Sequence, residues 1–196
     1  EGPHEGVLIR DRGWNPLLPT TLDYAVSHFS EQGTVAPRGW YISYDDEEQK
    51  FTDVRRENVS VRATGLLGLT AREPLITGVD TTLMWGRWFS DDDEEACLLP
   101  AAMASALGIG AEEVGQATVQ IFGKEFVVAG VFDAEAFDNV HDLDGEPLTP
   151  ADFQMSSNAA LGPVSGPQMA VTEEADAYEV RPFVHLAADN VLILPY

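Results

Sequence analysis

The chain has 196 residues, of which 44% are apolar, and this is enough for one compact domain or two small subdomains that share a core. Thirty-three acidic residues against eleven basic ones give a formal net charge of −22. Because no cluster of lysines and arginines is present to neutralise phosphates, this charge excludes nucleic acid as an expected partner, and it also opposes adsorption to an anionic lipid surface.

The first expected elements are a strand, a helix and a second strand. Residues 7–12 (VLIRDR) are typical of a strand and are followed by the chain-breaking segment GWNPLLP. Thr20 and Asp23 match a capping box at the start of a helix, and residues 37–44 (PRGWYISY) predict the next strand. This order indicates a βαβ unit with a right-handed crossover. The apolar face of the helix would consist of Leu22, Ala25, Val26 and Phe29.

The segment that follows predicts a loop, a strand and a boundary. Residues 45–49 (DDEEQ) are expected to form an exposed loop, and residues 58–69 begin with the alternation of a half-buried strand. Pro and Gly in TAREPLITGVD then indicate a subdomain boundary, which we place between residues 76 and 77.

The stretch MWGRWFSDDDEEACLLPAAMASALG, residues 84–108, combines two tryptophans, five consecutive acids and a long uncharged run. Ser90 is expected to cap a turn in the acidic segment, and residues 96–99 to form a short buried strand. Pro100 suits the first turn of a helix that Gly108 ends. The tryptophans and the helix are expected to belong to the core, and the acids to form a solvated rim.

A hairpin is expected in TVQIFGKEFVVAGVF, residues 118–132. A type II′ turn at Gly123-Lys124 would pair Ile121 with Phe126, and Val119 with Val128, on one face. Farther on, the acidic, turn-rich segment after residue 133 and a loop at residues 158–166 precede two expected strands at residues 178–187 and 190–195.

The usual catalytic patterns are not found in the sequence. Cys97 is the single cysteine and lies between apolar neighbours, which is typical of a buried, inert thiol. The histidines have no metal-ligand spacing, and Ser27 and His28 are adjacent on the expected helix, so their side chains should diverge. Neither a G-x-S-x-G elbow nor a Walker A loop occurs. We therefore expect no enzyme and no cofactor, although an acid pair acting in a hydrolase remains an alternative.

The acidic residues offer two candidate metal sites. The run at residues 91–95 would point its carboxylates in divergent directions, unlike calcium ligands. In DNVHDLDGEPL, Asp142 and Asp144 have EF-hand-like spacing, but Val140 and Ala151 occupy ligand positions, and a β-turn explains the segment. The alternative function is therefore a stand-alone acidic, calcium-dependent binding module. Its metal candidates are Asp138, Asp142 and Asp144.

A joint pattern runs through residues 77–133. It consists of Gly-Arg followed by an aromatic residue and acids, then a buried strand leading into a small-residue helix that ends in Leu-Gly, and then a hairpin closing on alternating apolar residues and Gly. In order and spacing this pattern resembles the MacB-like periplasmic core domain of FtsX-type ABC transporter permeases, and the closing DNVLILPY is similar to a strand of that family. The matching positions are Gly86, Arg87, Phe89, Leu107, Gly108, Gly115, Phe126, Val128, Gly130 and Val131.

The resemblance implies an α+β fold, with residues 1–76 as a βαβ-containing, porter-like α/β half-subdomain. Residues 77–196 would form a mixed, strand-rich subdomain that contains the hairpin and ends in a return strand. The domain would be non-catalytic and extracytoplasmic, held on the periplasmic side between two membrane helices. Its partners would be the rest of the permease and the ATPase subunit, and it would relay their motion to a lipoprotein, lipid or peptide cargo.

Two features depart from the family pattern. The family domain continues past the strand at LILPY with another βαβ unit, and the segment of residues 142–188 is bulkier than expected. The abrupt start at Glu1 and the apolar end VLILPY also suggest a fragment of a larger protein.

Overall fold

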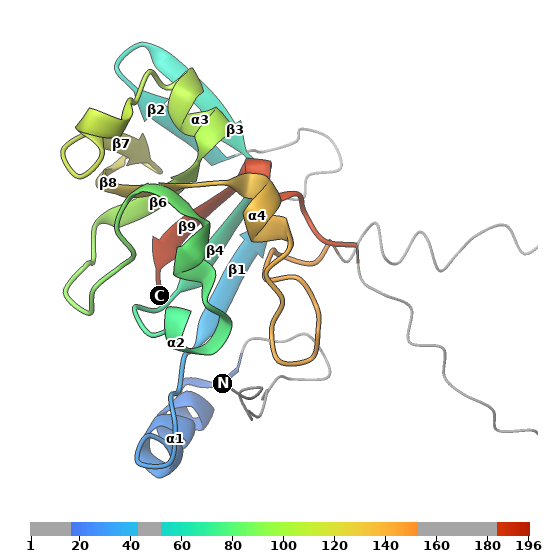
Figure 1. Cartoon of the computed structure of the whole chain (residues 1–196). Helices are drawn as coiled ribbons and strands as arrows, with labels where there is room; N and C mark the ends of the chain where they lie inside the picture. The colour runs from blue at the N-terminus through green and yellow to red at the C-terminus, as the bar shows by residue number, and fades with distance from the viewer. Residues whose placement is uncertain (1–16, 43–51, 153–183) are drawn as a thin grey trace, which may run out of the picture.

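The computed structural model describes residues 17–42, 52–152 and 184–196 (Figure 1). In this part of the chain, nine strands form one mixed sheet in the order β1-β4-β9-β6-β8-β7-β2-β3, and β5 pairs with β8. The strands are β1 (Arg38–Ile42), β2 (Thr52–Arg56), β3 (Val59–Ala63), β4 (Gly65–Leu69), β5 (Leu83–Gly86), β6 (Ala96–Pro100), β7 (Thr118–Ile121), β8 (Lys124–Phe132) and β9 (Val191–Pro195).

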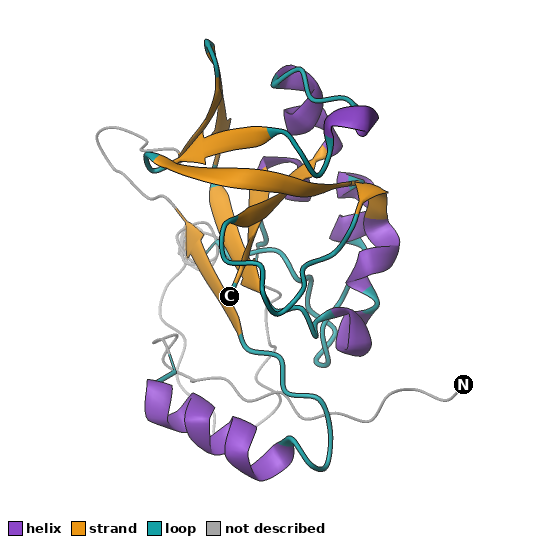
Figure 2. Ribbon diagram, turned by 90° about the vertical axis from the view of Figure 1, so that its left-hand side faces the viewer, coloured by secondary structure: helices purple, strands orange, loops and turns teal. Residues whose placement is uncertain are grey.

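The helices are short, and among the described residues none is long and apolar enough to cross a membrane. Figure 2 shows α1 away from the others, which lie along the sheet. The helices are α1 (Pro19–Phe29), α2 (Pro74–Thr77), α3 (Ala101–Ala106) and α4 (Ala134–Asp138), with 3-10 turns η1 (Val79–Thr82), η2 (Ala111–Glu113) and η3 (Ala188–Asn190).

The last strand in the chain lies inside the sheet. β9 pairs with β4 in parallel and with β6 in antiparallel orientation, while β6 pairs with β8 in parallel. The other neighbouring strands are antiparallel. Strands β1 and β4 therefore join the rest of the strand order through β9. The α+β class expected from the sequence is confirmed.

The sheet is buried on both faces around β6, all of whose residues are buried. Cys97 and Leu99 belong to one core cluster, together with Met103 of α3. Leu98 points to the opposite face, where Phe137 of α4 belongs to the second cluster. Because side chains alternate across a strand, this one apolar strand supplies both layers. The buried strand and the helix that Gly108 ends are confirmed.

Helix α1 differs from its prediction. It begins at Pro19, its N-cap residue is Leu18, and no side chain caps it, so the capping box at Thr20 and Asp23 is wrong. The proline has a backbone angle suited to the first turn and starts the helix before Thr20. Figures 1 and 2 show α1 beyond the start of β1, and none of its residues is buried.

The expected βαβ unit cannot be followed along its whole length. Residues 7–12 lie outside the described residues, and β1 pairs with β4 in antiparallel orientation. Residues 45–49 and 158–166, and most of residues 178–187, also lie outside them. Strands from both sides of residue 76 share the sheet, for β4 pairs with β9 and β2 with β7. The division into two subdomains stays a prediction.

The hairpin is present, but its predicted turn and register are wrong. The turn residues are Phe122 and Gly123, with φ of 51° and 81°, which is typical of a type I′ turn. Val119 pairs with Phe126 instead of Val128, and Ile121 pairs with Lys124. Both registers place the same apolar side chains on one face, so the alternation of the sequence could not distinguish them.

Candidate functional site

The motif glycines Gly86 and Gly130 face each other where β5 meets β8. Gly86 has φ of 81°, and a Cβ atom there would lie 2.2 Å from the carbonyl oxygen of Ala129. A Cβ atom on Gly130 would lie 2.9 Å from the carbonyl oxygen of Arg87. Both positions therefore require glycine because the two backbones approach too closely for a side chain.

Arg87 continues this junction into the acidic segment. Its backbone N–H donates to the carbonyl of Ala129 at 3.0 Å, and its guanidinium donates to both oxygens of Asp93, at 2.6 and 2.8 Å. Asp93 also accepts from the N–H and hydroxyl of Ser90, so Ser90 serves as a donor and its predicted capping role is wrong. The hydrogen bond from Arg87, followed by those from Ser90, holds the pKa of Asp93 well below its usual range despite partial burial.

Two more motif residues lie at the same junction. Gly115 has φ of 89°, and its N–H donates to the carbonyl of Val128 at 2.7 Å, on β8. Phe89 is buried in the second core cluster, beside the half-buried Trp88. Trp85, by contrast, is 36% exposed, so the expectation that it belongs to the core is wrong.

Gly108 lies elsewhere, just past the end of α3, with φ of 69°. Its carbonyl oxygen accepts from Arg56 of β2 at 2.7 Å, and Arg56 also donates to Glu113 at 2.6 Å. This hydrogen bond raises the pKa of Arg56 and lowers that of Glu113. The structure thus gathers Gly86, Arg87, Gly115 and Gly130 around β8, and places Gly108 at the end of a helix that packs in the first core cluster.

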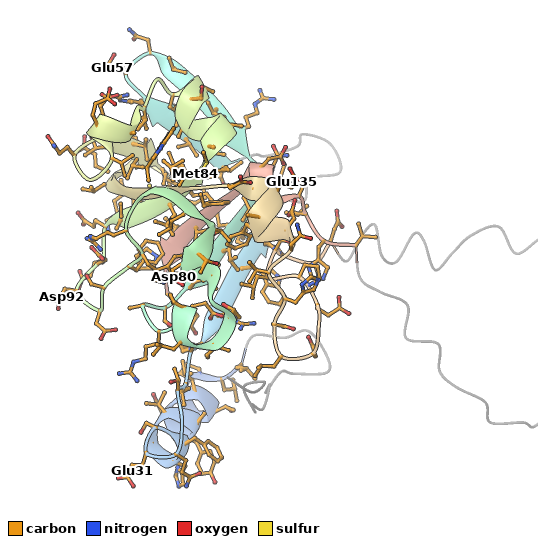
Figure 3. All side chains as sticks on the ribbon, in the orientation of Figure 1. Glu31, Glu57, Asp80, Met84, Asp92 and Glu135 are labelled. Atoms are coloured by element: carbon orange, nitrogen blue, oxygen red, sulfur yellow. The ribbon has the colours of Figure 1, made fainter. Side chains whose placement is uncertain are left out.

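An open depression of about 420 Å³ lies over this junction. Gly86, Arg87 and Gly115 line it together with residues 92–96. Asp92 and Glu94 are exposed, and Figure 3 shows Asp92 pointing away from the body of the molecule. Glu95 forms an ion pair with Lys124 at 3.3 Å. Four acids of the run, Asp91, Asp92, Glu94 and Glu95, are exposed to solvent as the sequence predicted, whereas Asp93 is partly enclosed by its contacts with Arg87 and Ser90.

The three metal candidates do not share a site. Asp138 accepts from the N–H of Ala188 at 2.9 Å, and burial raises its pKa. Asp142 accepts from the N–H groups of Asp144 and Glu146. The N–H of residue 145 donates to the carbonyl of residue 142, so the predicted turn is confirmed. In the described part of the chain, no three His, Cys, Asp or Glu side chains are grouped so that they could hold a metal ion.

The remaining reactive side chains have structural surroundings. Cys97 is fully buried, and burial raises the pKa of its thiol. The prediction that Ser27 and His28 diverge is wrong, because Ser27 Oγ lies 3.0 Å from His28 Nδ1. Nδ1 also lies 3.0 Å from the carbonyl of Tyr24, to which it can only donate, and Ser27 donates to the same carbonyl. With its Nδ1 used as a donor, His28 is not a base for Ser27.

Sequence reasoning missed an ion cluster next to β1. Arg38 pairs with the fully buried Glu73, and its Nη1 lies 3.4 Å from Asp142 Oδ2. These residues are far apart in the chain, and in so acidic a sequence no pattern singled out Glu73. A charged residue within the apolar, proline-containing segment AREPLIT is the one signal that could have indicated it.

The chain was compared with known proteins. No protein-family model matches it, and no curated protein matches it significantly. One similar solved structure is the periplasmic region of MacB from Actinobacillus actinomycetemcomitans, with 19% identity, a TM-score of 0.45, and coverage of 61% of this chain and 52% of that chain. Another is the extracellular domain of the noncanonic ABC-type transporter YknZ from Gram-positive bacteria, with 23% identity, a TM-score of 0.36, and coverage of 43% and 45%.

The chain spans about half the length of these two solved chains. The first is a periplasmic region, and the second is the extracellular domain of an ABC-type transporter.

Proposed function

We propose that the chain is a non-catalytic, extracytoplasmic domain of an ABC transporter permease, of the MacB-like periplasmic core type. In this proposal it is attached to the membrane through the rest of the permease. It relays movements driven by the ATPase subunit to a lipoprotein, lipid or peptide cargo, or to a partner protein.

The observation that carries the proposal is the role of the pattern residues in the fold. Gly86 and Gly130 permit a close backbone approach, and Gly115 hydrogen-bonds to the same strand. Arg87 fastens the adjoining acidic segment through Asp93. Four of the residues by which the sequence resembles the permease family, Gly86, Arg87, Gly115 and Gly130, thus build one close-packed junction, which suits a domain that transmits force as a unit.

The chemistry of the described side chains agrees with a non-catalytic role. The strongest carboxylate contact at the depression, Arg87–Asp93, is satisfied internally, and the thiol of Cys97 is buried. Asp92 and Glu94 at the rim are exposed to solvent. The surface at this depression would therefore recognise a partner by shape and charge, and would not act on it chemically.

The location can be tested by thiol labelling of the full-length protein in its own membrane. Ser60 is exposed on β3, so Ser60→Cys provides an accessible thiol, while the buried Cys97 gives little background. We expect a membrane-impermeant maleimide to label the Ser60→Cys protein in intact protoplasts or spheroplasts. The unsubstituted protein is the matched control, and its labelling measures the background that Ser60→Cys must exceed.

Labelling that requires lysis of the cells would contradict the extracytoplasmic location. The relay is tested separately, by joining β5 to β8 through a Trp85→Cys, Val131→Cys disulfide at a paired position. Trp85 is partly exposed, but Val131 is fully buried in the first core cluster, so the reduced double variant is the control for changes in the core. We expect ATP turnover by the assembled transporter to change when the bond forms and to recover when it is reduced. Unchanged turnover and unchanged transport in the oxidised protein would argue against a relay through this junction.

A further inference from the structure

One turn of the chain carries a sequence motif that the proposed function does not use. Asn58, Val59 and Ser60 form an Asn-x-Ser triplet whose middle residue is not proline, and such a triplet is the acceptor motif for N-linked sugars in secreted proteins. Of all the asparagines in the sequence, Asn58 alone is followed by Ser or Thr two positions later. Because so short a motif also occurs by chance, its place in the fold decides whether an enzyme can use it.

The triplet lies at the tip of the hairpin that joins β2 to β3. Glu57 and Asn58 are the two residues between the paired ends of these strands, and Glu57 has φ of 52°. Residues 57–60 are all exposed. Figure 3 shows Glu57 at one end of the molecule and Glu31, just past α1, at the other. A large group attached to Asn58 would therefore extend into solvent.

The hydroxyl of Ser60 lies on the outer face of this hairpin. Ser60 pairs with Arg55, whose side chain is 58% exposed, whereas the neighbouring Val54 of β2 is buried. Since side chains alternate across a strand, Ser60 faces away from the core. β3 also ends the sheet order, with no strand beyond it among the described residues. The motif is thus open to an enzyme from the tip, from the outer face and from the edge of the sheet.

Asn58 differs from the asparagines that support the fold. Nδ2 of Asn139 donates to the carbonyl of Glu135 at 2.7 Å, and Nδ2 of Asn190 donates to the carboxylate of Asp189 at 2.6 Å. No other described residue hydrogen-bonds to the side chain of Asn58. The described fold therefore does not depend on this amide.

We propose that Asn58 is the acceptor of an N-linked glycan, which a transferase adds from a lipid-linked glycosyl phosphate. In this step the side-chain nitrogen of Asn58 forms a bond to the anomeric carbon of the sugar. The bond from that carbon to the phosphate oxygen breaks, the phosphate leaves with the bonding electrons, and the amide nitrogen loses one proton to the transferase. The inference rests on the proposed function, since the motif is an acceptor only in a domain outside the cytoplasm.

A glycan at this tip would protect the free edge of β3. An open edge strand can pair with a strand of another chain, and a bulky, hydrophilic group beside it obstructs that approach. The glycan would also lie next to Val59, which is 44% exposed. Its effect would be to keep the domain from associating through β3.

The modification can be tested on the full-length protein purified from its own membrane. Trypsin cleaves after Arg56 and Arg62 and so releases residues 57–62, whose mass and fragmentation show whether Asn58 carries a sugar. We expect this peptide to be heavier than its sequence by whole sugar residues. Asn58→Gln and Ser60→Ala should each lose the added mass, whereas Ser60→Thr, the matched control, should keep it. Loss in Ser60→Ala but not in Asn58→Gln would place the sugar on the serine hydroxyl and would overturn the proposal.

An unmodified peptide from the unsubstituted protein would overturn the inference wherever the domain lies. Thiol labelling of Ser60→Cys shows the location separately, and because this variant lacks the hydroxyl of the motif, a glycan would not hinder its labelling. An unmodified peptide from a protein that is labelled in intact protoplasts or spheroplasts refutes the glycan alone. Labelling only after lysis refutes the proposed function as well.

Discussion

Arg38 of β1 and Glu73 at the start of α2, 35 positions apart, form a two-point ion pair: Nε donates to Oε2 at 3.0 Å and Nη2 to Oε1 at 2.8 Å. Glu73 is fully buried, and Thr77 also donates to it, at 3.2 Å. A buried carboxylate destabilises the folded state unless a cation pairs with it. The main effect of each member of this pair is therefore to compensate the burial of the other.

We therefore expect unequal effects of single and double substitutions at this pair. Arg38→Met should lower the free energy of unfolding by about 3 kcal/mol, because Glu73 stays buried without its cationic partner. Glu73→Leu should lower it by less, because Arg38 keeps its contact with Asp142. The double variant should lose about 1 kcal/mol, because both charges are gone. Urea unfolding of the four proteins gives the coupling energy directly. Losses that simply add would show that the two side chains do not depend on each other.

The close contact between β5 and β8 predicts a strong effect at Gly86. Gly86→Ala combines a positive φ with a Cβ atom 2.2 Å from the carbonyl of Ala129, and should destabilise the protein by roughly 3 kcal/mol. Gly115→Ala is the matched control, because its φ is 89° but no atom lies within 4 Å of the added Cβ. It should cost about 1 kcal/mol from backbone strain alone. Thermal unfolding of both variants measures the difference, and similar losses would refute the close approach.

The turn at Phe122 and Gly123 predicts a stabilising substitution. Phe122 has φ of 51°, which is unusual for a bulky residue, and its side chain is 72% exposed. Asparagine adopts this conformation more readily, so Phe122→Asn should raise the free energy of unfolding by about 0.5 kcal/mol. Phe122→Ala removes the same aromatic ring without this conformational advantage and should not match the gain. Equal stability of the two variants would show that the turn is not of type I′.

The raised pKa of Asp142 predicts how global stability depends on pH. Since the folded pKa of about 6 exceeds the ordinary value of 3.8, this side chain favours folding at acidic pH and loses that contribution as the pH rises through about 6. Asp142→Asn should thus be more stable than the unsubstituted protein at about pH 8 by about 1 kcal/mol, and this advantage should vanish near pH ~4. Urea midpoints at matched pH values test it. Acidification also reduces the overall negative charge of both proteins, and this effect cancels when their stabilities are compared. A difference in stability that stays the same at every pH would contradict the prediction.

Local sequence patterns predicted the elements whose structure depends mainly on their own residues and little on neighbouring strands. The apolar run of β6, with Pro100 as its last residue and Gly108 at the end of the helix, was sufficient to place that strand and α3. Strand β2 was missed because its residues, TDVRR, contain one large apolar side chain. It becomes a strand through its neighbours β3 and β7, and in this position Thr52 and Val54 are buried.

Contacts between distant residues account for most of what the sequence did not predict. The pattern at Gly86 and Arg87 was noticed, but its physical reason, the approach to Ala129 and the pairing with Asp93, required the structure. Apart from the charge of Glu73 within the segment AREPLIT, this ion pair gave no local signal, since an acidic chain offers many carboxylates and spacing along the chain does not show which one is buried. Which of the many charged residues affect the stability of the fold depends on their burial, and not on their residue type.

The position of β9 inside the sheet has a consequence for how the chain acquires its structure during synthesis. The carbonyl of Asn190 accepts a hydrogen bond from the N–H of Thr64, 126 positions earlier, and β9 then fills the space between β4 and β6. Until residues 191–195 have left the ribosome, β4 and β6 each present an open edge to the cell. Translation must therefore deliver this segment before β4 and β6 can be joined, and a nascent chain stalled ahead of it would be a target for chaperones and proteases.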